Sequence, residues 1–232
     1  MADEREMVRS EVLGSVPHGF LTGIGHEGEP DPALIVPGGT LVRVKQVHSA
    51  RAVLVEAPFT GGELPEADAL VTTQPGLVLG IVTADCAPVL LADPAANVVA
   101  AAHAGWRGAF GGVIEETVAT MIAAGASAGR IVAAIGPTIA QPSYEVDQAF
   151  RDRLVEHDPG NSKLFAQGAP GHYQFDLPAY VRRRLHAAGV TTIEDLALDT
   201  YGLESTFHSF RRATHRGEPT YGRQFSLVSL PA

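Results

Sequence analysis

Four short apolar segments follow one another in the middle of the chain, and they limit the fold more than any other feature. Each is rich in valine, leucine, isoleucine or alanine and is bounded by turn-forming residues: 67–73 (ADALVTT), 76–84 (GLVLGIVTA), 87–93 (APVLLAD) and 97–103 (NVVAAAH). Apolar runs of this length between turn residues are typical of strands that are buried on both faces. We therefore expect four consecutive buried strands.

The flanking sequence predicts helices and further strands. Residues 40–56 begin with valines that alternate with basic residues, which is the period of a half-buried strand. Residues 113–122 carry apolar side chains four positions apart, which predicts a helix that ends near Gly125. The remaining expected elements are strands at 130–137 and 223–230 and amphipathic helices at 145–157 and 176–189, the latter with Asp176 as its N-cap.

These elements predict an α+β fold, a single domain over residues 1–232 with mixed β-sheets flanked by helices. Strands occur in runs as well as alternating with helices, which is not the pattern of a simple parallel Rossmann sheet. No G-x-G-x-x-G run leads from an expected strand into a helix, and no G-x-x-x-x-G-K-[ST] is present. A dinucleotide site or a P-loop is therefore not expected.

The charge of the chain argues against one class of function, the binding of nucleic acid. The chain has 17 lysine and arginine residues against 26 aspartate and glutamate residues, a formal net charge of −9. No basic run is present, so we expect no binding to nucleic acid, because neutralising phosphates requires a clustered basic surface. A small anion held by a few arginines is compatible with this charge.

The termini and the cysteine content bear on location. Residues 1–10 (MADEREMVRS) contain no apolar h-region of a secretion signal, and no apolar run is long enough to span a bilayer. The single cysteine cannot form an internal disulfide, which fits a reducing compartment. We expect a soluble cytoplasmic protein that does not bind membranes. Nothing in the sequence predicts an oligomeric state.

Three potential metal ligands lie at the ends of expected strands: His48, Cys86 and His103. Their spacing matches no zinc finger, but ligands from three separate strands would hold a metal over a sheet end and leave its fourth position open, as in catalytic zinc sites. Two other interpretations stay open. Cys86 fits a small buried hydrophobic residue, or a thiolate nucleophile with His103 as its base and Asp85 orienting the histidine.

Two arginine-containing segments are candidate anion sites. Residues 103–112 (HAGWRGAFGG) form a glycine-rich turn before the expected helix, where free N–H groups and Arg107 suit a phosphate or carboxylate. A tight turn with Trp106 in the core and Arg107 in solvent explains the same pattern. Residues 207–212 (FHSFRR) combine aromatic rings with Arg211 and Arg212, which suits a nucleoside as well as a solvated surface.

Taken together, the motifs resemble one family. QVHS, ADALVT, TADCAPVLLAD, AAAHAGWRG, IGPTI…YEV and FHSFRR…YGRQ occur in the order of the YfiH/YlmD-like family, over roughly residues 18–230. This family has been called laccase domain and polyphenol oxidase, and it is associated with purine nucleoside phosphorylase activity. The resemblance implies that His48, Cys86 and His103 are zinc ligands, which would explain why the only cysteine is kept.

The resemblance also implies a reaction. It is phosphorolysis of adenosine, inosine or guanosine to the free base and ribose 1-phosphate, with adenosine deaminase and methylthioadenosine phosphorylase side activities. Cys86 and His103 would take part in catalysis, with Asp68 and Asp85 as acid–base or supporting groups. The candidate residues for binding nucleoside and phosphate are Arg43, Gln46, Arg107, Arg211 and Arg212.

The chain departs from the family pattern at several positions. Thr138 and Asp199 stand where many relatives carry cysteine, so the resemblance implies no role for a second or third cysteine here. Phe210 stands where tyrosine is common, so a substrate contact through that hydroxyl would be missing. The segment 213–219 (ATHRGEP) also differs from the usual short loop.

Three rival functions remain open from the sequence. A copper-dependent polyphenol oxidase would use the same two histidines and cysteine, but multicopper chemistry needs a histidine-rich cluster, and only two of nine histidines lie in the strong motifs. A cysteine hydrolase built on Cys86 and His103 is suggested by a fold-level analogy to toxin deamidases. The third is a zinc- or nucleoside-binding module without turnover.

Overall fold

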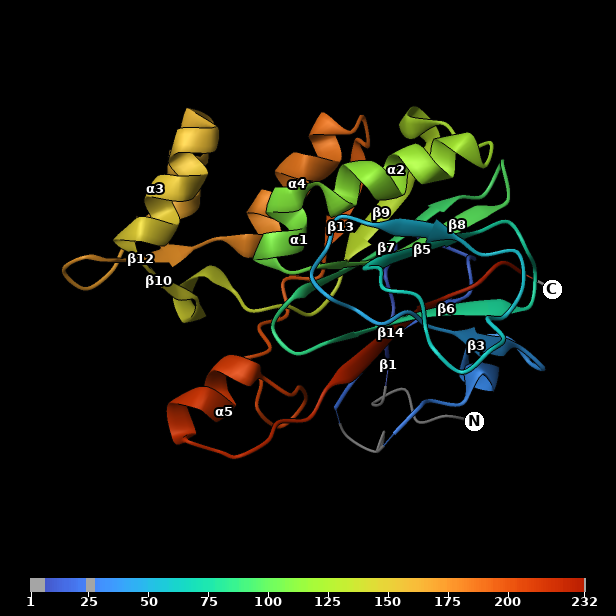
Figure 1. Ribbon diagram of the computed structural model, residues 1–232, viewed down its shortest axis with the longest axis horizontal. Coiled ribbons are helices and arrows are strands. Elements are labelled where there is room, and N and C mark those ends of the chain that lie inside the picture. The colour runs from blue at the N-terminus through green and yellow to red at the C-terminus, as the bar shows by residue number, and fades with distance from the viewer. Residues whose placement is uncertain (1–6, 24–27, 232) are drawn as a thin grey trace.

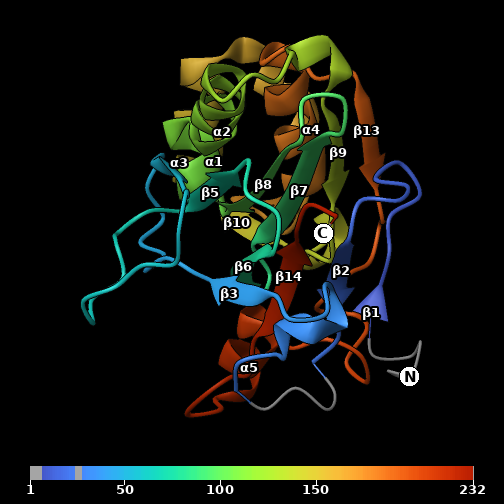
Figure 2. The same cartoon turned by 90° about the vertical axis from the view of Figure 1, so that its right-hand side faces the viewer.

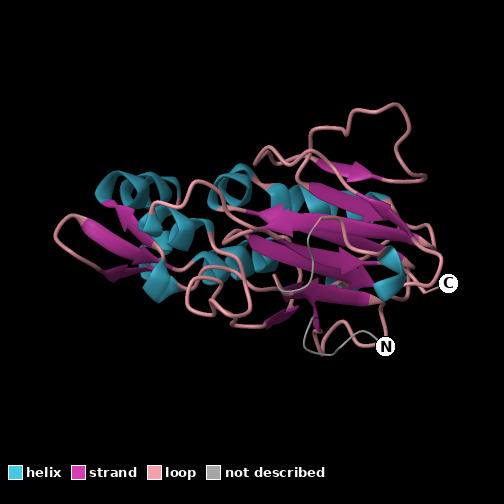
Figure 3. Ribbon diagram, turned by 90° about the horizontal axis from the view of Figure 1, so that it is seen from below, coloured by secondary structure: helices cyan, strands magenta, loops and turns pink. Residues whose placement is uncertain are grey.

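The structure is a computed structural model that describes residues 7–23 and 28–231. It is built in three layers, with helices above a six-stranded sheet and a five-stranded sheet below it (Figure 1). A third, three-stranded sheet projects at one end, beside helix α3 (Figure 3). This is the α+β architecture with mixed sheets flanked by helices that the sequence predicts.

The six-stranded sheet forms the centre of the molecule, and its two hydrophobic faces confirm the predicted buried strands. Its order is β13 (Thr192–Asp195), β9 (Val132–Ile135), β7 (Ala87–Asp93), β8 (Val98–Ala104), β5 (Ala69–Thr72) and β4 (Ala52–Leu54). The outer pairs are parallel and the inner ones antiparallel. Val89 and Leu91 pack in the helix-side core, whereas Leu90 and Ala92 pack towards the other sheet. Alternation along one strand thus supplies two hydrophobic cores.

Three helices cover the outer face of this sheet: α1 (Trp106–Gly111), α2 (Val113–Ala123) and α4 (Leu177–Ala187) (Figure 2). Helices α2 and α4 are confirmed, and the Asp176 carboxylate caps α4 by accepting from the Ala179 amide at 2.9 Å. In α2 the predicted apolar side is buried except for Ile122, which is 47% exposed. Helix α1 was not predicted, because its glycines made the segment resemble a turn.

The five-stranded sheet has the order β1 (Met7–Val8), β2 (His18–Leu21), β14 (Gln224–Val228), β6 (Leu77–Thr83) and β3 (Thr40–Val42). Phe20, Leu79 and Ile81 pack against the inner face of the six-stranded sheet. Helix α5 (Phe210–Arg216) precedes β14, which is the predicted C-terminal strand. The face-to-face stacking of the two sheets is seen from the side in Figure 2.

The segment 40–56 is not one strand, as predicted, but two short strands in different sheets. β3 pairs with β6 in the five-stranded sheet, and β4 pairs with β5 in the six-stranded sheet. The connection between them passes from one sheet to the other and contains His48 with a φ of 60°, a left-handed conformation that ends the extended backbone. Alternating apolar residues fit both sheets equally, so the pattern could not reveal the crossing.

The projecting part consists of β10 (Glu145–Asp147), β12 (His172–Phe175), β11 (Phe165–Gln167) and α3 (Gln148–His157). The helix predicted over 145–157 therefore begins three residues later. Its N-cap is Asp147, whose carboxylate accepts from the Phe150 amide. Phe150 contacts Trp106 of α1 edge-on at 4.9 Å, which ties this part to the helical layer.

Short 3-10 turns complete the described secondary structure, at Pro32–Leu34, Ala128–Arg130, Gln141–Ser143 and Pro159–Leu164. Within the described residues, no helix has the length and apolar character needed to cross a membrane.

A buried carboxylate at the end of β7 makes one stability prediction. Burial would raise the pKa of Asp93, but hydrogen bonds from Arg130 and the Ser127 amide outweigh it and hold the pKa below its ordinary value of 3.8. The stabilisation is therefore fully present above the unfolded-chain pKa and is lost as the pH falls through the lower folded pKa.

We expect Asp93→Asn to lower the free energy of unfolding by about 1–2 kcal/mol at pH 7, a modest value because Arg130 is half exposed. The difference from the unmodified chain should shrink below pH 4. Urea titrations at pH 7, 5, 4 and 3 measure it, with Asp152→Asn on the exposed face of α3 as the control. An equal difference at every pH would contradict the assignment.

Candidate active site

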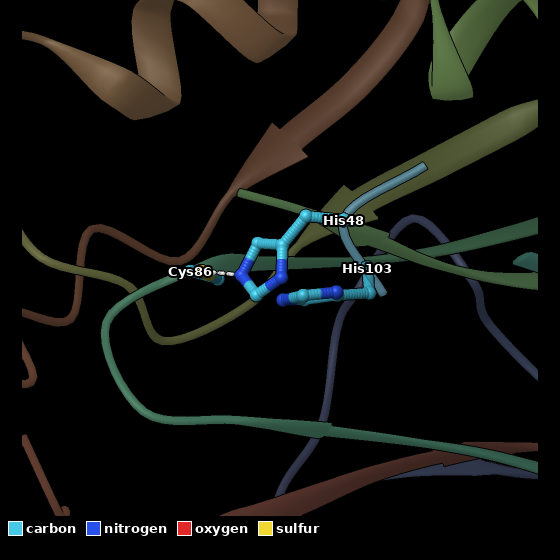
Figure 4. A group of neighbouring side chains, drawn as sticks. All are labelled: His48, Cys86 and His103. Atoms are coloured by element: carbon cyan, nitrogen blue, oxygen red, sulfur yellow. Dashed lines mark hydrogen bonds between the residues drawn. The ribbon is translucent and has the colours of Figure 1, made fainter. Parts of the chain in front are cut away.

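His48, Cys86 and His103 converge although they come from three separate segments. His48 lies in the connection between β3 and β4, Cys86 immediately precedes β7, and His103 lies near the end of β8 (Figure 4). Their potential ligand atoms all lie within 4.8 Å of one another, and the His48 Nε2 to Cys86 Sγ distance is 3.9 Å. The two imidazole rings meet edge-on, with centroids 4.8 Å apart.

This donor set fits a tetrahedral metal. Zinc–nitrogen bonds of 2.0–2.1 Å and zinc–sulfur bonds of about 2.3 Å place neighbouring ligand atoms ~3.5 Å apart. The observed separations, up to 4.8 Å, need to close by about 1.3 Å at most to reach that geometry. Two nitrogens and one sulfur leave a fourth position for a water or substrate atom, as the sequence analysis predicted.

One buried carboxylate holds two of the three ligands. Asp68 is completely buried, and its Oδ1 accepts hydrogen bonds from His103 Nδ1 at 2.8 Å and from the His48 backbone amide at 2.9 Å. Its Oδ2 accepts from the amide and hydroxyl of Ser49. Because Nδ1 of His103 is engaged, Nε2 is the nitrogen left free for a metal.

The local charges prepare the thiol for metal binding. Burial would raise the pKa of Cys86, but hydrogen bonding with His103 and His48 lowers this pKa to about 6. Burial would lower the pKa of His103, but its bonds with Asp68 and Cys86 raise it to about 9. The pKa of Asp68 is held at about 2 by His103 and Ser49, which outweigh its burial. A divalent cation would take the place of the Cys86 thiol proton.

Gly105, the N-cap of α1, permits the close approach of these ligands. A Cβ atom there would lie 2.7 Å from Cys86 Sγ and 3.1 Å from His48 Cδ2. We expect Gly105→Ala to weaken metal affinity by about 10-fold or more, because it displaces two ligands from the positions that their supporting contacts fix.

Competition with a chromogenic zinc chelator measures that affinity. Gly129→Ala is the matched control, because a Cβ at Gly129 meets nothing within 4 Å. Unchanged zinc affinity in Gly105→Ala would contradict the ligand geometry.

A cavity of about 250 Å³ opens over the triad. It is bounded by residues at the start of α1, at the start of α5 and by Tyr144, which immediately precedes β10. Its lining combines two of the three metal-ligand candidates with aromatic, apolar and charged side chains, whereas the third candidate, His103, is buried. The lining residues are His48, Ala84, Asp85, Cys86, Trp106, Arg107, Ile139, Tyr144, Leu177, Phe210 and Arg211.

Two of the predicted anion-binding arginines line this cavity. The Arg107 guanidinium stacks on the Trp106 ring at 4.8 Å and has no hydrogen-bond partner within the described residues. Arg211 donates one bond to the Glu145 carbonyl and lies over the Tyr144 ring at 5.1 Å, which leaves most of its donors free. Both cations can therefore bind an anion that enters the cavity.

Three other predicted substrate-binding residues lie outside the cavity. Arg212 donates to the carbonyls of Thr200, Tyr201 and Phe207, so its guanidinium holds its own loop together. The Gln46 side chain forms two hydrogen bonds to the backbone of Val82 and extends the edge of β6.

Arg43 lies in a separate hollow over the five-stranded sheet, where it pairs with Glu29 and approaches the Phe225 ring. The structure thus does not bring Arg43, Gln46 or Arg212 to the triad.

The expectation that Asp85 orients His103 is corrected, because Asp68 has that role. The Asp85 carboxylate instead accepts from the Thr200 hydroxyl and from the Arg211 amide, both at 2.6 Å. Its backbone, at φ 82°, accepts from Thr138 Oγ1 at 2.7 Å. Asp85 therefore joins β7 to the segments that carry Thr138 and α5, and it shapes the cavity wall.

The departures from the family pattern have structural explanations. Thr138 and Asp199 form a β-bridge, and the Asp199 carboxylate accepts from the Ser143 hydroxyl at 2.6 Å. Phe210 is half exposed at the cavity rim and contacts Tyr221 edge-on at 5.0 Å.

Sequence patterns did not predict one part of the cavity wall. Tyr144 was quoted as part of a motif without a role, yet it lines the cavity beside Cys86. Ile139 and Leu177 complete this wall. No local pattern distinguishes them from core residues. The Gln141–Ser143 turn next to Tyr144 was the only signal, and it does not predict which way the ring points.

Several proteins of similar sequence are named purine nucleoside phosphorylase. A purine nucleoside phosphorylase of Rickettsia prowazekii is 40% identical over 188 residues, which cover 81% of this chain and 77% of the relative. Among solved structures, YlmD from Geobacillus stearothermophilus matches with a TM-score of 0.85 at 28% identity, over 100% of this chain and 98% of that one. The protein YfiH of Bacillus licheniformis matches with a TM-score of 0.83 at 29% identity, over 99% and 98% of the two chains.

A family model described as multi-copper polyphenol oxidoreductase laccase matches residues 32–231. This range contains the whole triad and all the residues that line the cavity. With the motif order, the fold and the relatives in agreement, the chain belongs to this laccase-domain family, in which YfiH and YlmD are its structural neighbours.

Proposed function

We propose that this chain is a zinc-dependent purine nucleoside phosphorylase, and that residues 1–232 act as one catalytic domain. Its substrates are adenosine, inosine or guanosine together with phosphate, and its products are the free base and ribose 1-phosphate. The observation that carries the proposal is a single cavity that joins the His48, Cys86 and His103 cluster to two arginines with free donors. The name of the Rickettsia relative supports the reaction class.

The metal-binding residues give the cavity one reactive end. His48, Cys86 and His103 would hold Zn²⁺, which supplies a Lewis acid that polarises a substrate oxygen or nitrogen when it is bound. The chain's own part is to fix the ligands: Asp68 orients His103 through Nδ1 and holds the backbone of His48. One carboxylate thus supports two ligands.

The arginines give the cavity a positively charged end that can bind an anion. In phosphorolysis a phosphate oxygen forms a bond to C1′, the C1′–N9 bond breaks, and its electron pair leaves with the purine, which takes up a proton. Arg107 and Arg211 hold the phosphate and offset its charge as the bond forms. Trp106 and Phe210 provide flat apolar surfaces beside them for a nucleoside.

Deamination of adenosine and phosphorolysis of methylthioadenosine are proposed as side activities of the same cavity. Both substrates present a purine nucleoside skeleton, so they would use the same walls. The orientation of the substrate would select the reaction. A substrate with C6 of the purine near the metal would be hydrolysed there, whereas the opposite orientation would favour phosphorolysis at C1′.

A nucleoside panel tests the proposal. Purified protein with one zinc per chain is incubated with inosine, adenosine or guanosine, with and without phosphate, and the products are separated by chromatography. We expect hypoxanthine and ribose 1-phosphate from inosine only when phosphate is present. Folded, zinc-loaded protein that releases no base from any nucleoside would overturn it, and saturable binding without release would indicate a binding module.

A cysteine hydrolase is the second candidate, favoured by the lowered pKa of Cys86 beside His103. Here the thiolate would be the nucleophile and His103 its acid–base partner, oriented by Asp68. Alkylation of Cys86 by iodoacetamide separates the two candidates. Protection by stoichiometric zinc favours the metal site, whereas rapid alkylation of the purified protein, unchanged by a chelator, favours the hydrolase.

Copper oxidase chemistry agrees with the description of the family but fits the donor set less well. Within residues 7–23 and 28–231, the only group of three clustered His, Cys, Asp or Glu ligands is the triad. A multicopper oxidase needs several copper ions close together. We therefore propose zinc, and metal analysis of the purified protein distinguishes the two ions.

A further inference from the structure

Tyr144 is the one tyrosine whose hydroxyl has no partner among the described residues. The chain has five tyrosines. The hydroxyls of the other four form hydrogen bonds, to Gln148, Arg184, His215 and Arg223 respectively for Tyr173, Tyr180, Tyr201 and Tyr221. Tyr144 instead lines the cavity over the triad. Its hydroxyl is therefore available to a ligand.

The ring of Tyr144 is held firmly. Phe175 contacts it edge-on at 5.8 Å, and the Arg211 guanidinium lies over it at 5.1 Å. Its backbone is fixed as well, because the carbonyl accepts from the Phe175 amide at 3.0 Å and the amide donates to Gln141. A hydroxyl on a fixed ring loses little freedom when it binds a ligand, so its hydrogen bond contributes more to affinity.

Tyr144 lines the same cavity as Cys86 at the metal-ligand end and as Arg107 and Arg211 at the arginine end, and the Arg211 guanidinium lies over its ring. Burial, then the negative charge of Cys86, raises the pKa of Tyr144, and Arg211 acts in the opposite direction. The hydroxyl stays protonated near neutral pH and can donate a hydrogen bond.

The sugar of a nucleoside occupies the middle position in phosphorolysis. C1′ lies between the departing base on one side and the attacking phosphate on the other. Whichever of these two groups meets the metal, the sugar lies between the triad and the arginines. From this geometry we infer that Tyr144 is a substrate-binding residue whose hydroxyl donates a hydrogen bond to a ribose hydroxyl. This inference rests on the proposed function and adds recognition of the sugar to it.

Removal of the hydroxyl from either partner tests the inference. Tyr144→Phe keeps the ring and its contacts, and Tyr173→Phe is the matched control because that hydroxyl bonds Gln148 on the surface, outside the cavity. The zinc-loaded proteins are compared on inosine and on 2′-, 3′- and 5′-deoxyinosine. We expect Tyr144→Phe to lower kcat/KM on inosine about tenfold, with unchanged zinc content, and Tyr173→Phe to lower it not at all.

The deoxynucleosides identify the partner hydroxyl. For the one that lacks it, unmodified protein and Tyr144→Phe should have equal kcat/KM, as in a double-mutant cycle. An equal kcat/KM on inosine, or the same loss on all three deoxynucleosides, would overturn the inference and leave the proposed function standing.

Failure of the proposed function has a different signature. If the unmodified protein neither cleaves nor binds inosine, both proposals fall together. If it binds inosine without cleaving it, the same comparison is made on Kd from calorimetry. Equal Kd values for the unmodified protein and Tyr144→Phe would then overturn the role of Tyr144 alone.

Discussion

Cys86→Ala is expected to abolish zinc binding and to lower kcat/KM for phosphorolysis by at least about a thousandfold. Among the described residues, the thiolate is one of three side chains that converge on the proposed ion, within 4.8 Å of the two imidazole nitrogens. A Lewis acid contributes several kcal/mol to a transition state, and each 1.36 kcal/mol changes the rate tenfold. Metal content by mass spectrometry and initial rates on inosine measure the two effects.

The substitution should leave the fold intact, since Cys86 is only partly buried and alanine fits the same space. Circular dichroism and thermal unfolding provide that check. His172→Ala, which removes an exposed histidine on β12, is the control and should keep both zinc and activity. Full turnover by Cys86→Ala without zinc would remove the basis for the proposed chemistry.

Asp68→Ala is expected to have the largest effect on stability, lowering the free energy of unfolding by about 3–5 kcal/mol. The substitution leaves five donors without the acceptor that the fully buried Asp68 side chain supplies. These are His103 Nδ1, the Ser49 hydroxyl and the amides of Val47, His48 and Ser49. Zinc affinity should fall about 10- to 100-fold as well, because both histidine ligands lose their support.

Urea denaturation of metal-free protein and chelator competition measure the two effects of Asp68→Ala separately. Glu66→Ala is the matched control, because this nearby carboxylate is exposed and pairs only with Lys45. Asp68→Asn, which keeps the shape but presents an amide to several donors, should give an intermediate loss. Wild-type stability together with wild-type zinc affinity in Asp68→Ala would contradict its supporting role.

Local patterns predicted most of the secondary structure. The buried strands between residues 67 and 104 and the helices α2 and α4 followed from apolar periodicity and from caps such as Asp176, which depend only on neighbours in the chain. Helix α1 was missed because glycine disfavours helices, whereas burial of Ala109 and the contacts of Trp106 stabilise it here.

The candidate site was predicted only in part from the sequence. The triad was identified by residue type and by resemblance, and Asp68 was named as an acid–base or supporting group, but the partner of His103 was predicted to be Asp85 and is Asp68. Asp85 is next to Cys86 in the chain, yet β5 pairs with β8 in a register that sets Ala69 opposite Ala102. That register puts Asp68 beside His103, and it depends on which strands become neighbours.

The neighbouring residues Arg211 and Arg212 also have roles that the sequence could not predict. Arg211 and Arg212 are indistinguishable in sequence, but one reaches the cavity and the other binds three backbone carbonyls. Their directions follow from the start of α5, where Ser209 accepts from the Arg212 amide and Asp85 from the Arg211 amide. The second of these bonds joins residues 126 positions apart, so no local pattern contains it.

The sequence by itself determined the chemical inventory: one thiol and two imidazoles at strand ends, glycines and arginines at helix starts, and strands buried on both faces. Only the tertiary structure decided that these groups share one cavity, that Asp68 supports two ligands and that Tyr144 faces them. The physical reason is that side-chain type and periodicity are properties of neighbouring residues, whereas a binding site depends on the order and register of strands far apart in the chain.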